Sequence, residues 1–189
     1  MYKNNISINE VLNITNEYYI SYYCKNNICV LTSYNYINSY IEIPDKKDNL
    51  IKYITDTCNY DDIIINKCHY ITKCNSDNEC LSNKCYKNHC MFNNETQIIR
   101  CDNIYMGPTL FNERSSYMHC GKPFNEKCNN NNECSSKKCV NSYCNQQNNG
   151  PNESEGMIVM IYLIILIFIL IIFFFIYIII YKLRHNKQT

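Results

Sequence analysis

The sequence CNSDNECLSNKCYKNHC, at residues 74–90, returns 54 residues later as CNNNNECSSKKCVNSYC, at residues 128–144. Both stretches space four cysteines as C-x5-C-x4-C-x4-C, and they share Asn, Glu, Ser and Lys at intervening positions. Agreement in the spacing and in these residues indicates an internal duplication. Each stretch is too short to bury an apolar core, so we expect covalent cross-links to take the place of one.

Cysteine dominates the chemistry of the chain, with fourteen among 189 residues and none after Cys144. The number is even, so full pairing is possible, and four cysteines in one stretch allow three pairings between which the sequence does not choose. Each closed loop would add about 2–3 kcal/mol to stability by restricting the unfolded chain. The disulfide candidates are Cys24, Cys29, Cys58, Cys68, Cys74, Cys80, Cys85, Cys90, Cys101, Cys120, Cys128, Cys134, Cys139 and Cys144.

Zinc binding is the main alternative to disulfide bonding for these cysteines. Structural zinc sites usually use C-x2-C pairs, whereas the shortest cysteine spacing in this chain is C-x4-C. His69, His89 and His119 each adjoin a cysteine, which keeps a zinc site open as an alternative. The sequence has no P-loop, serine-hydrolase elbow, HExxH or paired-carboxylate motif, so we expect neither enzymatic activity nor a cofactor.

Residues 157–181 read MIVMIYLIILIFILIIFFFIYIIIY, which is 25 residues without a charge, Gly, Pro or Asn. At about 1.5 Å per residue, a helix of this length crosses the roughly 30 Å hydrocarbon core of a bilayer. We therefore expect one transmembrane helix here. A polar stalk at 147–156 precedes it, and a short basic tail at 182–189 follows it.

Two rules disagree about the orientation of this helix. Lys182, Arg184 and Lys187 follow the span, and the positive-inside rule places such a tail in the cytosol. The N-terminal stretch lacks the apolar core and cleavage site of a signal peptide. That absence predicts insertion after synthesis, with the long N-terminal part left in the cytosol. We give the second rule more weight, because the flanking charge bias is small.

The N-terminal region, residues 1–67, holds three cysteines and reads as a small mixed fold. Ser7 and Glu10 have the spacing of a helix capping box, and apolar residues then recur at helical intervals. Stretches rich in Ile, Val and Tyr predict strands. The expected elements are a helix over 8–23, strands over 28–32 and 40–43, a helix over 46–57, a strand over 63–65 and, within the connecting stretch 91–119, a turn at 106–108.

Together these patterns predict a small disulfide-rich α+β ectodomain with two repeated cystine modules, joined to one C-terminal transmembrane helix. The modules occupy 68–146, between the N-terminal region and the stalk, with repeat units at 74–90 and 128–144. The whole chain has only four glycines. Asparagine tolerates left-handed backbone better than most residues, so we expect it to replace glycine in the turns of the modules.

The pattern C-x5-C-x4-C-x4-C, with Glu before its second cysteine, resembles the short cystine modules of Dickkopf-type and EGF-like extracellular proteins. The resemblance covers 17 residues in each copy. Modules of that kind are binding or spacer units and not enzymes. The resemblance therefore implies a role in protein–protein contacts.

The layout of the whole chain is similar to that of tail-anchored, cysteine-rich virion membrane proteins of large cytoplasmic DNA viruses, poxviruses above all. Such viruses encode a thiol-oxidation machinery that works in the cytosol. Their host-cell penetration and fusion machinery includes small proteins of this layout. The resemblance implies a virion membrane protein with its N-terminal domain on the particle exterior. Its implied partners are the lipid bilayer and either other membrane proteins of the particle or a host surface.

Two other functions remain as alternatives. One is a cell-surface binding protein whose N-terminal part is translocated, and the other is a cytosolic, tail-anchored zinc protein. Glycosylation sequons at Asn5, Asn13, Asn94 and Asn152 bear on the first, because only a lumenal domain is modified there. The net charge of +1 gives no indication of a nucleic-acid partner. No motif points to a small-molecule substrate.

Overall fold

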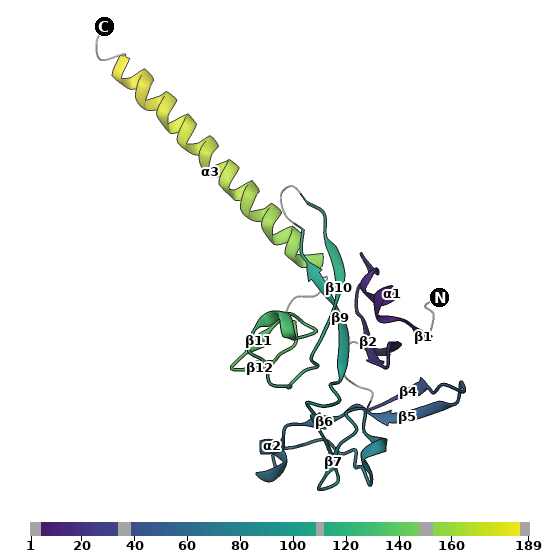
Figure 1. The fold of residues 1–189 in the computed structure, drawn as a ribbon. Coiled ribbons are helices and arrows are strands. Elements are labelled where there is room, and N and C mark those ends of the chain that lie inside the picture. The colour runs from purple at the N-terminus through teal and green to yellow at the C-terminus, as the bar shows by residue number, and fades with distance from the viewer. Residues whose placement is uncertain (1–4, 34–38, 109–111, 148–152, 186–189) are drawn as a thin grey trace. The chain divides into compact units, whose positions relative to one another are not determined.

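The computed structural model describes residues 5–33, 39–108, 112–147 and 153–185 (Figure 1). The chain divides into two compact units, so the disulfide-rich unit and the C-terminal helix are described separately. Within the predicted stalk, residues 148–152 lie outside the described residues, and residues 153–156 belong to the helix.

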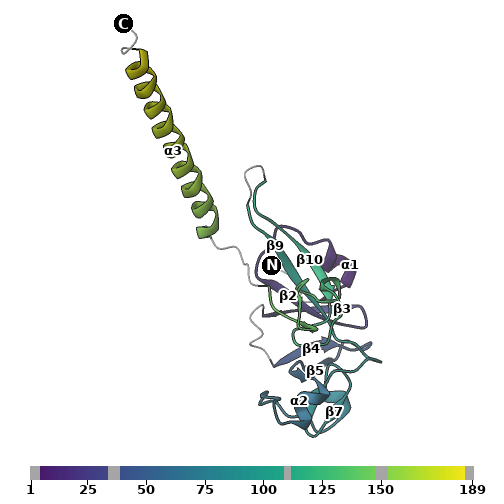
Figure 2. The same cartoon turned by 90° about the vertical axis from the view of Figure 1, so that its left-hand side faces the viewer.

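The disulfide-rich unit is built on an antiparallel sheet of five strands, whose neighbouring strands β9 and β10 run side by side in both views (Figure 1, Figure 2). Segments far apart in the sequence meet in this sheet, since β2 pairs with both β3 and β9. In sheet order the strands are β1 (Asn5–Ile6), β3 (Ile28–Ser33), β2 (Ile20–Lys25), β9 (Ile99–Met106) and β10 (Ser115–Gly121).

The helix predicted over 8–23 is much shorter in the structure. Its start is confirmed, because Ser7 and Glu10 form the expected capping box, but the helix α1 covers only Ile8–Leu12. Asn16 and Tyr19 have positive φ, which interrupts a right-handed helix. The residues that follow form β2, because their Ile, Tyr and Cys side chains pair with β3 and bury both faces of a strand.

The sheet buries a small apolar cluster on each of its two faces. On one face Val11 of α1 packs with Tyr22 of β2 and Met118 of β10, in a cluster of seven buried residues. On the other face Tyr23 packs with Ile41, in a cluster of five. Tyr22 and Tyr23 point to opposite faces because side chains alternate along a strand.

A second hairpin covers the face that carries Tyr23. The strands predicted over 28–32 and 40–43 are confirmed, as β3 and as β4 (Tyr40–Pro44). The helix predicted over 46–57 is wrong, because β5 (Leu50–Ile54) pairs with β4 and β6 (Thr57–Cys58) follows it. The side chain of Asp45 accepts backbone hydrogen bonds at the turn and so favours the hairpin.

The strand predicted over 63–65 is also wrong, since these residues lie at the end of the helix α2 (Tyr60–Ile64). A disulfide joins Cys58 to Cys68 and holds their Cα atoms 5.9 Å apart across ten residues of sequence. The helix and the turn after it, in which Lys67 and Cys68 donate backbone hydrogen bonds to the carbonyl of Asp62, lie within the loop that this disulfide closes. The apolar run at 63–65 predicted a strand, whereas these residues belong to a short loop whose ends are cross-linked.

The two cysteine-rich stretches have the same local structure. The first cystine segment, residues 74–90, and the second cystine segment, residues 128–144, each contain a one-turn 3-10 helix followed by a short hairpin. A Glu carboxylate in each accepts the backbone N–H of the Asn that follows the first cysteine. The elements are η1 (Asp77–Glu79), β7 (Cys85–Tyr86) and β8 (His89–Met91), and η2 (Asn131–Glu133), β11 (Cys139–Val140) and β12 (Tyr143–Cys144).

Asparagine takes many of the left-handed positions, and the prediction for the modules is confirmed at Asn83, Asn88, Asn125 and Asn141. Eight of the thirteen non-glycine residues with positive φ in the described ranges are asparagine. The two-residue turn between β2 and β3 is Asn26–Asn27, with φ of 50° and 66°. Positive φ at both central residues matches the right-handed twist of a hairpin, so these asparagines set the register of β2 against β3.

The largest difference from the sequence prediction concerns residues 91–119, which are not a simple connection. They contain β9 and most of β10, the two longest strands among the described residues. The expected turn at 106–108 begins where β9 ends at Met106, and residues 109–111 lie outside the described ranges. The alternation of apolar and polar residues that marks a strand breaks within β9, where Asp102 and Asn103 are followed by three apolar or aromatic residues.

The C-terminal helix α3 (Glu153–His185) contains the predicted span 157–181. Its stretch Met160–Arg184 is long and apolar enough to cross a membrane. A helix that is apolar on every face is suited to lipid on every side. The chain therefore has the form of a single-pass membrane protein with a disulfide-rich domain before the span.

We expect Asn26→Val to lower the free energy of unfolding by about 1–2 kcal/mol, because a β-branched residue is strained at positive φ. Asn26→Gly is the matched control and should leave the unfolding midpoint unchanged or raise it. Urea unfolding of the full-length protein in detergent micelles measures both. Equal midpoints for the valine and glycine variants would contradict the left-handed turn.

Candidate interaction site

All fourteen cysteines lie in disulfides. In each cystine segment the first cysteine pairs with the third and the second with the fourth, which is one of the three pairings that the sequence left open. The remaining three disulfides lie outside these segments. The pairs are Cys24–Cys29, Cys58–Cys68, Cys74–Cys85, Cys80–Cys90, Cys101–Cys120, Cys128–Cys139 and Cys134–Cys144.

Two of these disulfides cross-link directly paired strands of the main sheet. Cys24–Cys29 joins β2 to β3, and Cys101–Cys120 joins β9 to β10. The Sγ atoms of Cys24 and Cys101 are 3.7 Å apart, so the two disulfides pack against each other in the interior. They hold two pairs of strands in register, and backbone pairing of β2 with β9 joins the two pairs.

Three sulfur atoms approach one another in each cystine segment, but they are already bonded. The Sγ atoms of Cys74, Cys80 and Cys90 lie within 4.8 Å of one another, and the second segment has the same arrangement. Zinc binds the thiolate form of cysteine. A zinc site would therefore require reduction of these disulfides first.

A buried aspartate joins the second cystine segment to the main sheet. Asp102 of β9 accepts hydrogen bonds from the hydroxyls of Ser21 and Ser135, the former at 2.6 Å. Its carboxylate also bonds the guanidinium of Arg100, with 2.8 Å from Nε to Oδ1. The side chains of Arg100 and Asp102 are 0% and 6% exposed, so the pair is screened little by solvent.

The first cystine segment reaches the sheet through apolar and backbone contacts instead. Leu81 lies in the apolar cluster around Tyr23, and its backbone N–H bonds the carbonyl of Ile54 at 3.0 Å. Lys25 Nζ bonds the carbonyl of Leu81 at 2.9 Å. Ser135 occupies the position in the second segment that corresponds to Leu81. Corresponding positions therefore attach both segments to the sheet. Leu81 of the first segment does so by apolar packing, and Ser135 of the second does so through its hydroxyl.

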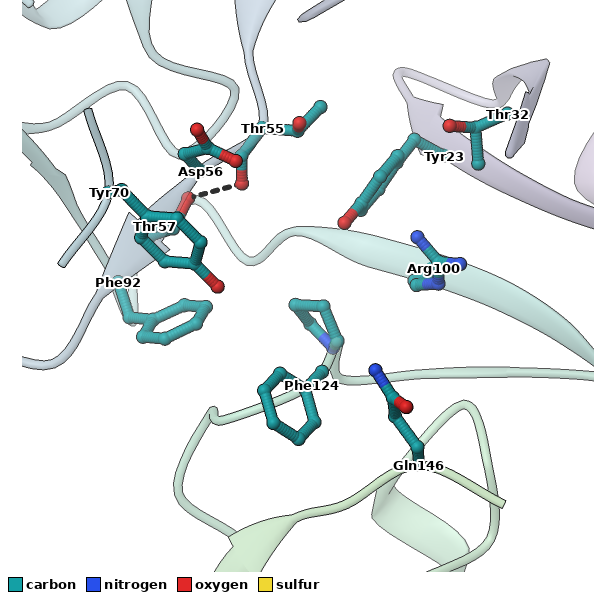
Figure 3. Close-up of a pocket in the computed structure, with 11 residues that line it drawn as sticks. Tyr23, Thr32, Thr55, Asp56, Thr57, Tyr70, Phe92, Arg100, Phe124 and Gln146 are labelled. Carbon is teal, nitrogen blue, oxygen red and sulfur yellow. Dashed lines mark hydrogen bonds between the residues drawn. The ribbon is translucent and has the colours of Figure 1, made fainter. Parts of the chain in front are cut away.

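A cavity of about 100 Å³ lies where the sheet meets the chain around both cystine segments. Figure 3 shows Tyr23, Arg100 and Gln146 turned toward this space from three different parts of the chain. Arg100 also stacks on the ring of Tyr23, with 4.9 Å from Cζ to the ring centroid. Burial raises the pKa of the Tyr23 phenol, so the phenol stays neutral and able to donate a hydrogen bond.

A larger hollow of about 450 Å³ lies between α2 and the second cystine segment. Tyr60, Phe92 and Tyr143 contribute its aromatic lining, and Glu126 contributes a carboxyl. Glu126 is 7% exposed, and its Oε2 atom has no hydrogen-bond partner among the described residues. Burial raises the pKa of Glu126 to about 7, with a nearby Glu133 adding to the effect and Lys122 opposing it.

Two polar contacts connect α2 and its flanking residues to the chain just before the second cystine segment at this hollow. Asn59 Nδ2 donates to the carbonyl of Asn125 at 2.7 Å. Lys127 Nζ lies 2.8 Å from Asp61 Oδ2, in an exposed ion pair. Both contacts involve residues between Cys58 and Cys68, so that disulfide positions one wall of the hollow.

Sequence reasoning identified the cysteines but missed Arg100, Asp102 and Glu126. Arg100 and Asp102 lie two residues apart in β9, on either side of Cys101, in a stretch interpreted as a connection. Charged residues at alternate positions beside a cysteine are a signal for one buried polar face of a strand. The sequence offers no corresponding signal for the burial of Glu126.

No known protein family, curated protein or solved structure matches the chain.

We expect Asp102→Asn to lower the free energy of unfolding by about 3 kcal/mol, because it leaves the buried Arg100 guanidinium without its counter-ion. Asp61→Asn removes an exposed ion pair and should change stability little. Denaturant unfolding of the full-length variants gives the comparison. If Asp61→Asn lowered the free energy of unfolding as much as Asp102→Asn, burial would not explain the contribution of the Arg100–Asp102 pair.

The raised pKa of Glu126 predicts that the free energy of unfolding falls as the pH rises from about 4.5 to about 7. Its folded-state pKa is raised to about 7 from 4.5. The folded form therefore binds the proton more tightly, and the resulting stability is lost as pH rises through the folded pKa. Glu126→Gln should be more stable than the native protein at pH 8, by about 2 kcal/mol, and equally stable at pH 4. Thermal unfolding at both pH values measures the difference, and equal effects at both would exclude this carboxyl as the cause.

Proposed function

We propose that this protein is a single-pass virion membrane protein that acts through protein–protein contacts, in particle structure or in virus–cell fusion. The observation that carries the proposal is the combination of seven disulfides with one C-terminal helix suited to lipid on every side. Disulfides persist in oxidising surroundings, so the domain before the helix belongs on the oxidised side of a membrane.

The surface of the disulfide-rich unit favours a macromolecular partner over a small molecule. The hollow at Glu126 is lined by aromatic, amide and charged side chains from several segments. Tyrosines with one polar end are enriched in protein interfaces. The loop after α2 adds exposed apolar side chains, including Ile65 at 56% and Ile71 at 91% exposure. Covalent cross-links hold such a surface in one conformation, so less conformational entropy is lost when a partner binds.

The virion assignment requires that the disulfides form in the cytosol, through the thiol-oxidation machinery of the virus. Such a virus would form these disulfides on a domain that never crosses a membrane. The mature particle would then expose the domain at its surface. We propose the particle exterior as the location of the disulfide-rich unit for that reason.

The alternative is a cell-surface binding protein whose disulfide-rich unit is translocated into the secretory pathway. The basic residues after the span, Lys182 and Arg184, favour this orientation by the positive-inside rule. Asn94 supports it as well, because this sequon residue is exposed and lies in a turn that a glycosyltransferase can reach.

Protease treatment of intact purified particles from the native source tests the virion assignment. We expect the protein to copurify with the particles and its disulfide-rich unit to be cut without detergent, leaving a membrane-protected fragment that contains α3. An internal core protein of the particle is the control and should stay intact. Absence of the protein from particles, or cleavage only after detergent, would contradict the proposed location.

Removal of N-linked glycans distinguishes the two candidate functions. The virion assignment predicts no change in mass on treatment of the native protein with a peptide N-glycosidase. A cell-surface protein predicts a loss of mass that Asn94→Gln reduces by one glycan. Asn93→Gln, which leaves the sequon intact, is the control.

A further inference from the structure

Among the seven disulfides, Cys58–Cys68 is distinguished by the polar groups beside it. The Sγ atom of Cys68 lies 3.3 Å from Nδ1 of His89. On the other side of the ring, Nε2 of His89 lies 2.8 Å from Nζ of Lys73. Cys58 is buried, at 3% exposure, whereas Cys68 and His89 are half-buried. One sulfur of this disulfide is therefore accessible and next to an imidazole.

The hydrogen-bond donors define the direction of this chain of contacts. The Lys73 ammonium can only donate, so Nε2 of His89 is the acceptor. Nδ1 of a neutral imidazole then carries the hydrogen and points it at Cys68 Sγ. The His89 ring thus connects the Lys73 ammonium to the Cys68 sulfur through two hydrogen bonds. Such surroundings stabilise a thiolate and lower the pKa of a cysteine thiol.

The second cystine segment lacks this arrangement, although its local structure is the same. At the offset of 54 residues, Lys73 corresponds to Lys127, but His89 corresponds to Tyr143 and Cys68 to Lys122. The extra disulfide and the imidazole therefore occur together and only at the first segment. A purely structural cross-link has no need of the imidazole.

We propose that Cys58–Cys68 is a reactive disulfide, reduced by an external dithiol, with Cys68 as its reacting sulfur and His89 and Lys73 as the groups that stabilise the Cys68 thiolate. The electron donor is a dithiol of the oxidoreductase class, which leaves as its own disulfide. The other six disulfides remain as cross-links of the fold.

The exchange proceeds in two balanced steps. A thiolate of the dithiol attacks the accessible Sγ of Cys68, the bond to Cys58 breaks, and Cys58 Sγ takes the electron pair and a proton from water. The second thiolate of the donor then attacks the donor sulfur of the mixed disulfide and expels Cys68 as a thiolate. His89 and Lys73 stabilise this leaving group, and a thiol of lower pKa leaves faster.

Opening this disulfide would release one wall of the hollow at Glu126. The loop that it closes contains Asn59 and Asp61, which contact Asn125 and Lys127 near the second cystine segment. Without the cross-link, the loop would be held by these two polar contacts and by apolar contacts, with Ile63 packed against Met91 and Tyr60 against Tyr86. Reduction at Cys68 would thus loosen the contact between α2 and the second segment while the main sheet stays cross-linked.

Graded reduction of the full-length protein in detergent micelles tests the proposal. The protein is treated with increasing dithiothreitol, quenched with a thiol-alkylating reagent, and the modified cysteines are identified by mass spectrometry. We expect Cys58 and Cys68 to be alkylated first, at a rate about tenfold or more above that of any other pair. His89→Ala should slow complete opening about tenfold, because slower release of Cys68 lets the Cys58 thiol attack the mixed disulfide and re-form the bond; Lys73→Ala should slow it less.

Tyr143→Ala, at the corresponding position of the second segment, is the matched control and should leave the rate at Cys68 unchanged. Intact disulfides in every variant before reduction, shown by the absence of alkylation, establish that the variants are folded. After selective opening, the rate of alkylation of Cys68 against pH reports its thiol pKa, which should lie below the usual value of about 8.5 and rise in His89→Ala. Earlier opening of another pair, or an unchanged rate in His89→Ala, would overturn the proposal.

Discussion

The covalent connection between neighbouring strands is the constraint on which the rest of the disulfide-rich unit depends. The buried apolar residues form separate small clusters, and two of them are built largely from cysteine. Clusters of three to seven residues bury too little surface to offset the loss of chain entropy for a unit of this size. Cross-links reduce that loss in advance, because they restrict the unfolded chain. The main sheet and both cystine segments therefore depend on the cross-links for their stability.

The cross-links leave the polar groups free to determine how the parts fit together. Asp102 binds two serines and an arginine from different segments in the interior, where a carboxylate is stable only with such partners. The first cystine segment has the apolar Leu81 at the corresponding position, and Lys25 binds the carbonyl of that residue. The same local structure is thus attached to the sheet in two chemically different ways. Glu126 Oε2 has no hydrogen-bond partner in the part of the chain that the structure describes, and burial raises the pKa of this carboxyl.

The sequence predicted the parts of the structure that depend on local chemistry. The capping box at Ser7, the strands at 28–32 and 40–43, the apolar span and the asparagine turns each follow from a few neighbouring residues. The predictions over 8–23, 46–57 and 63–65 failed where distant residues decided the outcome. Residues 20–25 are a strand because β3 and β9 pair with them, and residues 60–64 form a short helix within the loop that Cys58 and Cys68 close.

The candidate site was predictable only in part, for the same reason. Cysteine spacing identified every residue of the disulfides, but the pairing depends on which strands become neighbours. Asp102 and Arg100 gain their importance from contacts with residues more than thirty positions away, such as Ser135 and Ser21. A half-buried His89 beside Cys68 follows from the fold of the first segment and has no signature in a linear motif.

The central claim is that seven specific disulfides hold the fold of the unit before the membrane helix. Mass mapping of peptides from the native protein, digested without reduction after alkylation, measures this most directly. The account predicts no alkylated cysteine above trace level and cross-linked peptides that join the first to the third and the second to the fourth cysteine in each segment. Free thiols throughout residues 24–144, or bound zinc with reduced cysteines, would contradict it.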